Sequence, residues 1–269
     1  MKSIANLLRL DGRVALVVGG AGHIGGAALE TLTELGAMVA VVDVDAAACT
    51  RTKDALVAGG AAVDDVEVVN CDLADETSTR RAVSDVRERF GRLDIVIHAA
   101  AFVGTTRFAG WAVPFADQSA AAFDAALRVN LTSAFVVCQA AAAPLAEHGN
   151  GAIVLVSSIY GGVAPDHRLY EGTPMANPLG YGASKAGLQQ LARALSTTLA
   201  PKVRANCVSP GGVWRNQPAS FVERYEARTP LQRMAVEEDL KGAFAYLCSD
   251  LSAYVTGQNL VVDGGWTAW

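Results

Sequence analysis

The chain has 269 residues, of which 51% are hydrophobic and 18% are charged, and its formal net charge is −5. This composition excludes a disordered chain and offers no positive surface for nucleic acid or an anionic membrane. Five widely spaced cysteines and four histidines form none of the pairs typical of disulfide frameworks or metal sites, so we expect no metal and a reducing cytoplasmic location.

Short apolar runs alternate with amphipathic stretches along the whole sequence. In chain order, strands are predicted at Val14–Val18, Met38–Val42, Val66–Val69, Ile95–Ile97, Ile153–Val156, Arg204–Val208 and Asn259–Val262. Helices are predicted at Ile24–Leu35, Ala46–Ala58, Glu76–Phe90, Phe123–Ala142 and Tyr181–Leu199. Fully apolar strands between helices predict an α/β fold: a Rossmann-type, doubly wound, mostly parallel seven-stranded sheet with helices on both faces.

The sequence also predicts a single domain. No linker rich in Pro, Gly or Ser, no charge block and no repeat divides residues 1–269. Arg9, Asp11 and Arg13 interrupt any signal-peptide core, and no 18-residue apolar run is evident, so we expect no membrane span.

A glycine-rich segment joins the first predicted strand to the first helix. It reads Gly19-Gly20-Ala21-Gly22-His23-Ile24-Gly25-Gly26. Glycines permit a tight turn and a close approach of the backbone to a pyrophosphate, and the helix N-terminus offers free N–H groups to the anion. We therefore predict a dinucleotide site, with contacts in this loop from Gly19, Gly22, His23, Ile24 and Gly25.

Two acidic residues follow the next two strands. Asp43 ends the second strand, eighteen residues after Gly25, where its carboxylate can accept hydrogen bonds from the adenosine ribose. The same charge would repel a 2′-phosphate, which favours NAD over NADP. Asp72, followed by Leu73, comes after the third strand, where it could meet the adenine amino group or act as an ordinary helix N-cap.

Tyr181 and Lys185 stand four residues apart at the start of a predicted helix, so they share one helical face. A phenol with a pKa near ~10 is a poor base at neutral pH. A nearby ammonium favours the phenolate, so Lys185 is expected to lower the pKa of Tyr181. Ser158 closes the fifth strand at the sheet edge where such folds bind ligands, and Asn130 lies within a long apolar helix, where a polar role or a satisfied core amide would explain it.

Together these residues resemble the short-chain dehydrogenase/reductase family over nearly the whole chain. The matching segments are GGAGHIGG, Asp43, CDL, Asn130 in RVNLTSAF, VSS, YGASK, SPGG at 209–212 and VTGQNLVVDGGW. The resemblance implies that Tyr181 is the catalytic acid/base, that Lys185 tunes it and binds ribose, that Ser158 orients the carbonyl and that Asn130 anchors a relay water. It also implies cofactor contacts from Ala99, Ala100, Pro210 and Gly211, and a homotetramer.

Three positions depart from the family pattern: Val18 replaces a threonine, His23 takes a glycine position, and His98 begins the segment after the fourth strand. The spacing of Gly19, Gly22 and Gly25 is similar to that of the nucleotide-sugar-modifying branch. This leaves open a sugar epimerase or dehydratase that retains NAD. A non-enzymatic NAD-binding regulator is the other alternative, although such proteins usually lose the Tyr or Lys.

The substrate cleft is predicted to be walled by loops at about 159–180 and 211–228, in which Gly and Pro argue against regular structure. Their many hydrogen-bonding side chains favour a small polar substrate, such as a sugar or polyol derivative, with a carboxylate or phosphate for Arg168 or Arg215. A narrower resemblance links these segments to flagellin-modification and nonulosonic-acid enzymes. The C-terminal Trp266–Trp269 segment is expected to contact a neighbouring subunit.

Overall fold

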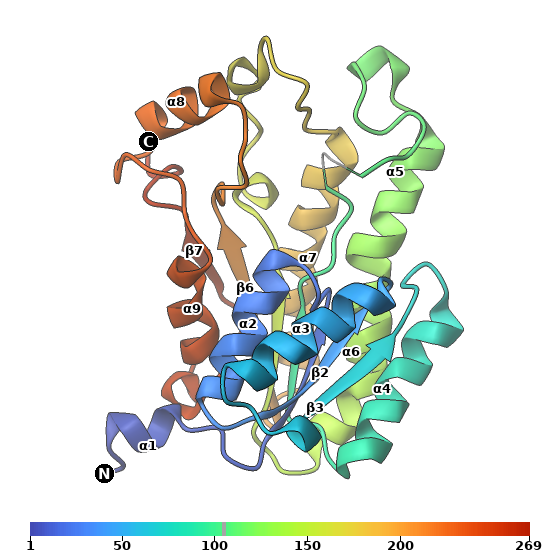
Figure 1. Cartoon of the computed structure of the whole chain (residues 1–269), viewed down its shortest axis with the longest axis vertical. Coiled ribbons are helices and arrows are strands. Elements are labelled where there is room, and N and C mark those ends of the chain that lie inside the picture. The colour runs from blue at the N-terminus through green and yellow to red at the C-terminus, as the bar shows by residue number, and fades with distance from the viewer. Residues whose placement is uncertain (104–105) are drawn as a thin grey trace.

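The protein forms a seven-stranded sheet whose strands all run parallel, in the order β3-β2-β1-β4-β5-β6-β7 (Figure 1). This computed structural model describes residues 1–103 and 106–269. The strands are β1 Val14–Val18, β2 Met38–Asp43, β3 Val66–Asn70, β4 Ile95–His98, β5 Gly151–Val156, β6 Val203–Pro210 and β7 Asn259–Val262. The predicted fold class is confirmed, and the strand order reverses between β1 and β4.

Helices cover both faces of the sheet. They are α1 Ile4–Leu8, α2 His23–Glu34, α3 Ala46–Ala58, α4 Glu76–Phe90, α5 Ala120–Leu127, α6 Ser133–Ala146, α7 Leu179–Thr198, α8 Ala219–Arg228 and α9 Glu238–Cys248. The sequence prediction missed α1, α8 and α9. It was wrong to leave 211–228 without regular structure, because Phe221 and Tyr225 give α8 a buried face.

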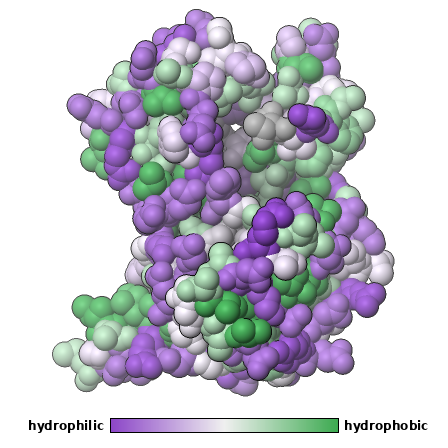
Figure 2. Space-filling view, in the orientation of Figure 1, coloured by the Kyte–Doolittle hydropathy of each residue, from purple (hydrophilic) through white to green (hydrophobic). Residues whose placement is uncertain are grey.

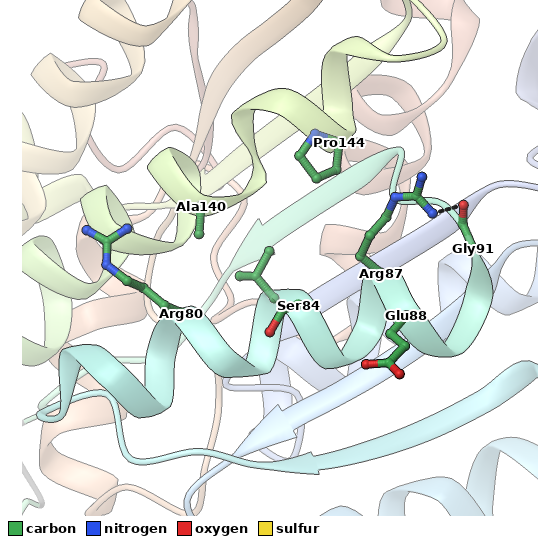
Figure 3. Close-up of a pocket in the computed structure, with 8 residues that line it drawn as sticks. Arg80, Ser84, Arg87, Glu88, Gly91, Ala140 and Pro144 are labelled. Carbon is green, nitrogen blue, oxygen red and sulfur yellow. Dashed lines mark hydrogen bonds between the residues drawn. The ribbon is translucent and has the colours of Figure 1, made fainter.

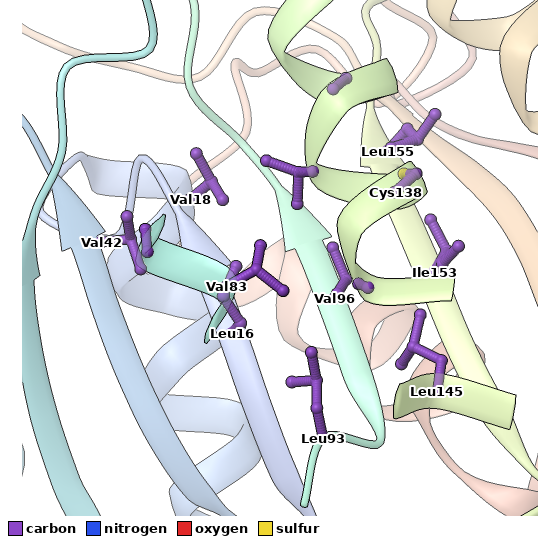
Figure 4. Close-up of a cluster of buried hydrophobic side chains, with 14 of the residues drawn as sticks. Leu16, Val18, Val42, Val83, Leu93, Val96, Cys138, Leu145, Ile153 and Leu155 are labelled. Atoms are coloured by element: carbon purple, nitrogen blue, oxygen red, sulfur yellow. The ribbon is translucent and has the colours of Figure 1, made fainter. Parts of the chain in front are cut away.

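The core lies in two layers because each buried strand sends alternate side chains to opposite faces. Leu16 and Val18 of β1 pack in the layer beneath α4, α6 and α7, and Figure 4 shows them in one cluster with Val83 of α4 and Cys138 of α6. Ala15 and Val17 of the same strand pack toward α2, α3 and α9. A strand covered on both faces must be apolar throughout, which is the pattern that identified these strands.

The helix predicted at Phe123–Ala142 is interrupted. A π-helical turn at Arg128–Thr132 separates α5 from α6, and turns of this kind often mark functional positions. The whole stretch Ala120–Ala146 has 27 residues and a mean hydropathy of 1.5 in its most apolar window, enough to span a membrane by length and composition. The expectation that no stretch of the chain is long and apolar enough for a span was therefore wrong. In the structure Val137 and Ala141 from this stretch pack into the sheet core.

The carboxyl ends of the parallel strands meet at one edge, where a doubly wound sheet binds ligands. Above this edge lie α8 and the insert 159–180, and Figure 2 shows the surface hollowed between this lobe and the part carrying α5. The insert contains 3-10 turns at Ile159–Gly161 and His167–Tyr170 before α7 begins at Leu179. The expectation that Gly and Pro exclude regular structure there was therefore wrong.

Candidate active site

The glycine-rich loop after β1 has the backbone shape that a dinucleotide phosphate site needs. Gly19 has a φ of 77°, and a Cβ there would overlap the backbone of Ala100. A Cβ on Gly25 would overlap the Gly19 carbonyl oxygen. The loop therefore packs directly against the segment Ala99–Ala100 after β4, and side chains are excluded at both glycines by contact.

Helix α2 begins at this loop with its N–H groups available. Its N-cap is Gly22, which supplies no side-chain hydrogen bond. The first N–H groups of a helix have no partner within the helix, so those of His23, Ile24 and Gly25 can bind an anion. This chain's residues fit a dinucleotide pyrophosphate at the position the sequence predicted.

The side chain of His23 pairs with an acidic residue and is not directed at the phosphate loop. It is exposed, and its Nδ1 lies 3.3 Å from Oε1 of Glu237 at the start of α9. The same oxygen pairs with Nη1 of Arg215 at 2.9 Å. Glu237 thus links the phosphate loop to the segment after β6, a connection that the sequence analysis did not find because the three residues are far apart in the chain.

Asp43 is the last residue of β2, and one oxygen of its carboxylate accepts hydrogen bonds from the backbone. Its Oδ1 accepts hydrogen bonds from the N–H groups of Val44, at 2.8 Å, and Asp45, at 3.4 Å. Asp72 accepts one from Ala74 N–H at 2.9 Å, whereas the N-cap of α4 is Asp75. The N-cap alternative for Asp72 is therefore wrong. The Leu73 side chain is buried in the core, so only its backbone can face a ligand.

Tyr181 and Lys185 lie together on the first turns of α7. Lys185 Nζ is 5.6 Å from the centre of the Tyr181 ring and donates a hydrogen bond to the Val156 carbonyl oxygen at 2.8 Å. Lys185 is buried, and desolvation lowers its pKa to about 8. Gln189, one turn further along the same face, bonds Ser157 and Ser209. The i, i+4, i+8 spacing could have revealed Gln189 from the sequence.

Ser157 and Ser158 have different surroundings at the end of β5. Ser157 Oγ donates to the Lys185 carbonyl oxygen at 2.8 Å and accepts from Gln189, so it joins β5 to α7. Ser158 Oγ accepts from Tyr160 N–H at 3.2 Å, and its hydroxyl lowers the pKa of the nearby Tyr181 phenol. Ser158 is therefore the serine that shares a site with Tyr181.

The protonation of Tyr181 differs from the sequence prediction. Burial raises the pKa of Tyr181 above its ordinary value of 10, Ser158 opposes that rise, and Tyr170 adds to it. The expectation of a lowered pKa is not met, because burial is the largest influence on this phenol. At neutral pH the phenol is therefore protonated and ready to donate to a carbonyl oxygen, while oxidation of an alcohol requires its deprotonation.

Asn130 lies in the π-helical turn and is fully buried. Its Oδ1 accepts from Phe102 N–H at 2.5 Å, and its Nδ2 donates to Ser184 Oγ at 2.9 Å. The side chain thus ties the segment after β4 to α7. Protein groups occupy its amide, and the role of Asn130 as the anchor of a relay water stays a prediction.

His98 is a second buried polar residue near Lys185. Its Nε2 lies 2.8 Å from Ser133 Oγ, which itself donates to Val129, so the ring donates to the serine. Burial, and secondly the charge of Lys185, lower its pKa to about 3. His98 is therefore a neutral structural residue that joins β4 to α6.

The segment after β6 borders the predicted binding site of the nicotinamide ring. Pro210 is the last residue of β6, and Gly211 N–H donates to the Val262 carbonyl oxygen at 2.9 Å. A Cβ on Gly211 would come within 2.9 Å of the Tyr225 hydroxyl, which accepts from Gly212 N–H. This edge therefore packs closely against α8.

The arginines proposed for a substrate anion already have carboxylate partners. Arg168 makes two hydrogen bonds with Asp166, at 2.8 and 2.7 Å, on an outer surface shared with Trp269. Arg215 pairs with Glu237. The expectation that either arginine waits for a substrate carboxylate or phosphate is not supported. In the C-terminal segment Trp266 is buried against α8 whereas Trp269 is 74% exposed, so the contact of this segment with a neighbouring subunit stays a prediction.

Comparisons with known proteins place the chain among similar dehydrogenases and reductases. Residues 19–267 match the family model described as enoyl-(acyl carrier protein) reductase. The chain is 34% identical to cyclohexanol dehydrogenase of Rhodococcus sp., covering 97% of this chain and 98% of the relative. It is 32% identical to D-threitol dehydrogenase of Mycolicibacterium smegmatis, covering 96% and 94%.

Two solved structures share the fold. A short-chain dehydrogenase from Leptospira borgpetersenii with bound NAD+ has a TM-score of 0.82, 30% identity and coverage of 99% of this chain and 96% of the other. A gluconate 5-dehydrogenase from Burkholderia cenocepacia, in complex with NADP and tartrate, has a TM-score of 0.86, 26% identity and coverage of 99% and 100%. The chain belongs to the short-chain dehydrogenase/reductase family and is an oxidoreductase that interconverts alcohols and ketones.

Proposed function

We propose that the protein is an NAD-dependent dehydrogenase/reductase for a small polar alcohol or ketone. The observation that carries this proposal is the meeting of Ser158, Tyr181 and Lys185 at the sheet edge beside the glycine-rich loop. A bound nicotinamide would supply the hydride acceptor or donor. The chain's own residues hold the proton and orient the substrate oxygen.

Each residue of the site has a distinct task. In oxidation the Tyr181 oxygen accepts the hydroxyl proton of the alcohol, and in reduction it returns a proton to the carbonyl oxygen. The Ser158 hydroxyl donates to the same substrate oxygen. Lys185 uses one of its three N–H donors on Val156, which leaves two for a ribose hydroxyl.

The preference for NAD rests on Asp43. Its carboxylate is held at the end of β2 by two backbone N–H groups, so a 2′-phosphate would meet a negative charge. We expect kcat/KM with NAD to exceed that with NADP at least tenfold. Asp43→Asn should reduce this ratio about tenfold, whereas the control Asp72→Asn should not. Equal kcat/KM with both cofactors in the wild-type protein would refute the preference.

The proposal of a polar substrate is based on the side chains of the insert that borders the predicted cleft. The insert 159–180 joins the hydroxyl groups of Tyr160 and Tyr170 and the amide of Asn177 by hydrogen bonds, and the Tyr160 backbone lies against Gly182, the residue after Tyr181. Steady-state oxidation of D-threitol, D-arabinitol and cyclohexanol, with a steroid alcohol as the apolar reference, tests the proposal. A polyol should give the highest kcat/KM, and the highest value with the steroid would overturn the proposed substrate class.

We further propose a cytoplasmic homotetramer with no nucleic-acid or membrane partner. Five buried free thiols suit a reducing compartment. Phe135 on α6 leaves 46% of its surface exposed, and Figure 3 shows a groove between α4 and α6 lined by Arg80, Arg87 and Pro144. Such a face suits contacts between copies of the chain. Light scattering should give four times the 27.9 kDa chain mass, and a monomer would refute this proposal.

A further inference from the structure

Three polar side chains of the insert 159–180 form a connected hydrogen-bond network. The hydroxyl oxygens of Tyr160 and Tyr170 lie 3.1 Å apart. Asn177 Nδ2 donates to the Tyr170 hydroxyl oxygen, also at 3.1 Å. All three residues are half-buried, so the network is still accessible to a ligand.

Counting donors and acceptors shows that the network is incomplete. The two phenols carry two protons, and one of them forms the bond between the rings. Tyr170 accepts from Asn177, so the second phenol proton has no partner among the described residues, whichever ring donates. Oδ1 of Asn177 likewise accepts no hydrogen bond within residues 1–103 and 106–269. The network therefore offers two donors, the second phenol proton and the second Nδ2 hydrogen of Asn177, and an acceptor in Asn177 Oδ1, so it can both donate to and accept from a hydroxyl group.

This network lies next to the catalytic phenol. Tyr160 N–H donates to Ser158 Oγ at 3.2 Å, which places Tyr160 against the reaction site. A Cβ on Gly182, the residue after Tyr181, would be 3.1 Å from the Tyr160 carbonyl oxygen. The effect of Tyr170 on the pKa of Tyr181 agrees with this proximity.

An aromatic cluster holds the two phenols in position. Tyr160 meets the edge of Trp266 at 6.1 Å, and Tyr170 meets Phe221 at 5.3 Å. Tyr225 stacks between Phe221 and Trp266. Rings fixed by such packing present their hydroxyl groups at low entropic cost, which favours selective recognition.

We infer that Tyr160, Tyr170 and Asn177 form a specificity subsite that hydrogen-bonds a second hydroxyl group of the substrate, near the oxidised carbon. The preferred substrates are therefore diols and polyols, not simple alcohols of the same size. This inference rests on the proposed function and adds the residues that select within the polar class. A site built around a substrate hydroxyl discriminates against the analogue that lacks it, because its own polar groups are then left unpaired.

Matched substrates test the subsite most directly. The quantity measured is the ratio of kcat/KM for the best 1,2- or 1,3-cyclohexanediol to kcat/KM for cyclohexanol. The wild-type ratio should exceed ten. Tyr160→Phe, Tyr170→Phe and Asn177→Ala should each lower it roughly fivefold, the effect of one hydrogen bond. Tyr254→Phe removes a fully exposed phenol and should leave the ratio unchanged.

The possible outcomes separate the subsite from the proposed function. A wild-type protein that prefers cyclohexanol, or a ratio unchanged in all three variants, overturns the subsite while oxidation of an alcohol still stands. No turnover of any alcohol by a protein that binds NAD overturns the proposed function and the subsite with it. Both phenylalanine variants keep the aromatic ring, so they should fold, and circular dichroism is the measurement that checks their folding.

Discussion

Lys185 Nζ donates a hydrogen bond to the carbonyl oxygen of Val156 at 2.8 Å, which joins helix α7 to the last residue of strand β5. The buried ammonium thus lies beneath the Tyr181 ring, at the point where the sheet meets the substrate cleft. Because a buried charge is disfavoured, this arrangement lowers the pKa of Lys185 to about 8. The site therefore carries a cost in stability that can be measured.

The pH dependence of stability should reveal that buried charge. The pKa of Lys185 is about 8 in the folded protein and 10.5 ordinarily, so between these values the unfolded chain binds more protons and stability rises with pH. From pH 8 to 9.5, urea denaturation should show a gain of about 2 kcal/mol relative to Lys185→Met, in which this titration is absent. Parallel curves for the two proteins would contradict the assignment.

The two adjacent serines should separate catalysis from stability. Ser158→Ala removes the hydroxyl that neighbours Tyr181 and is proposed to orient the substrate oxygen, and we expect kcat to fall about 100-fold with little change in stability. Ser157→Ala removes the bond to the Lys185 carbonyl oxygen, and should lower the free energy of unfolding by about 1–2 kcal/mol. Kinetics and urea denaturation of both variants provide the check. A larger loss of kcat for Ser157→Ala would reverse the roles.

Adjacent glycines at the start of α2 offer a similar comparison for cofactor binding. A Cβ on Gly25 would overlap the Gly19 carbonyl oxygen, so Gly25→Ala should open the loop and weaken NAD binding more than about tenfold. A Cβ on Gly26 meets no described atom within 4 Å, so Gly26→Ala should retain binding and gain up to about 1 kcal/mol of stability. Calorimetric titration with NAD distinguishes them, and equal affinities would contradict the proposed phosphate loop.

Activity should follow the protonation of Tyr181. Since burial raises the pKa of this phenol above 10, kcat/KM for alcohol oxidation should keep rising with pH beyond 8. The rise reflects the growing phenolate fraction of the free enzyme. A pH profile of kcat/KM between 6 and 10 tests this, and a plateau reached at or below pH 7 would show that the phenol is acidic in the free enzyme.

Most of the sheet could be predicted because its central strands are apolar runs, as at Val14–Val18, where both faces are buried. The helix break at Asn130 was not predictable in the same way. It depends on hydrogen bonds to Phe102 and Ser184, which are distant in the sequence. Helix α8 was missed because its apolar positions face the aromatic cluster above the sheet and not the main core.

The spacing of residues in the sequence could predict which residues form the site, but it could not predict their pKa values or all of their charged partners. Tyr181 and Lys185 could be paired because a helix brings them together, whereas the pKa of the phenol depends on how deeply the fold buries it. Arg168 could have been paired with Asp166, two residues away, from the sequence alone. The partner of Arg215 is Glu237, which only the tertiary structure identifies.

In the proposed mechanism the Tyr181 hydroxyl transfers the proton in catalysis, and the protein binds the dinucleotide whether or not that hydroxyl is present. The decisive measurement is kcat for polyol oxidation by Tyr181→Phe, together with its calorimetric affinity for NAD. We predict a loss of kcat of at least about 1,000-fold with NAD affinity within threefold of the wild type. Turnover by Tyr181→Phe at the wild-type rate would contradict the account.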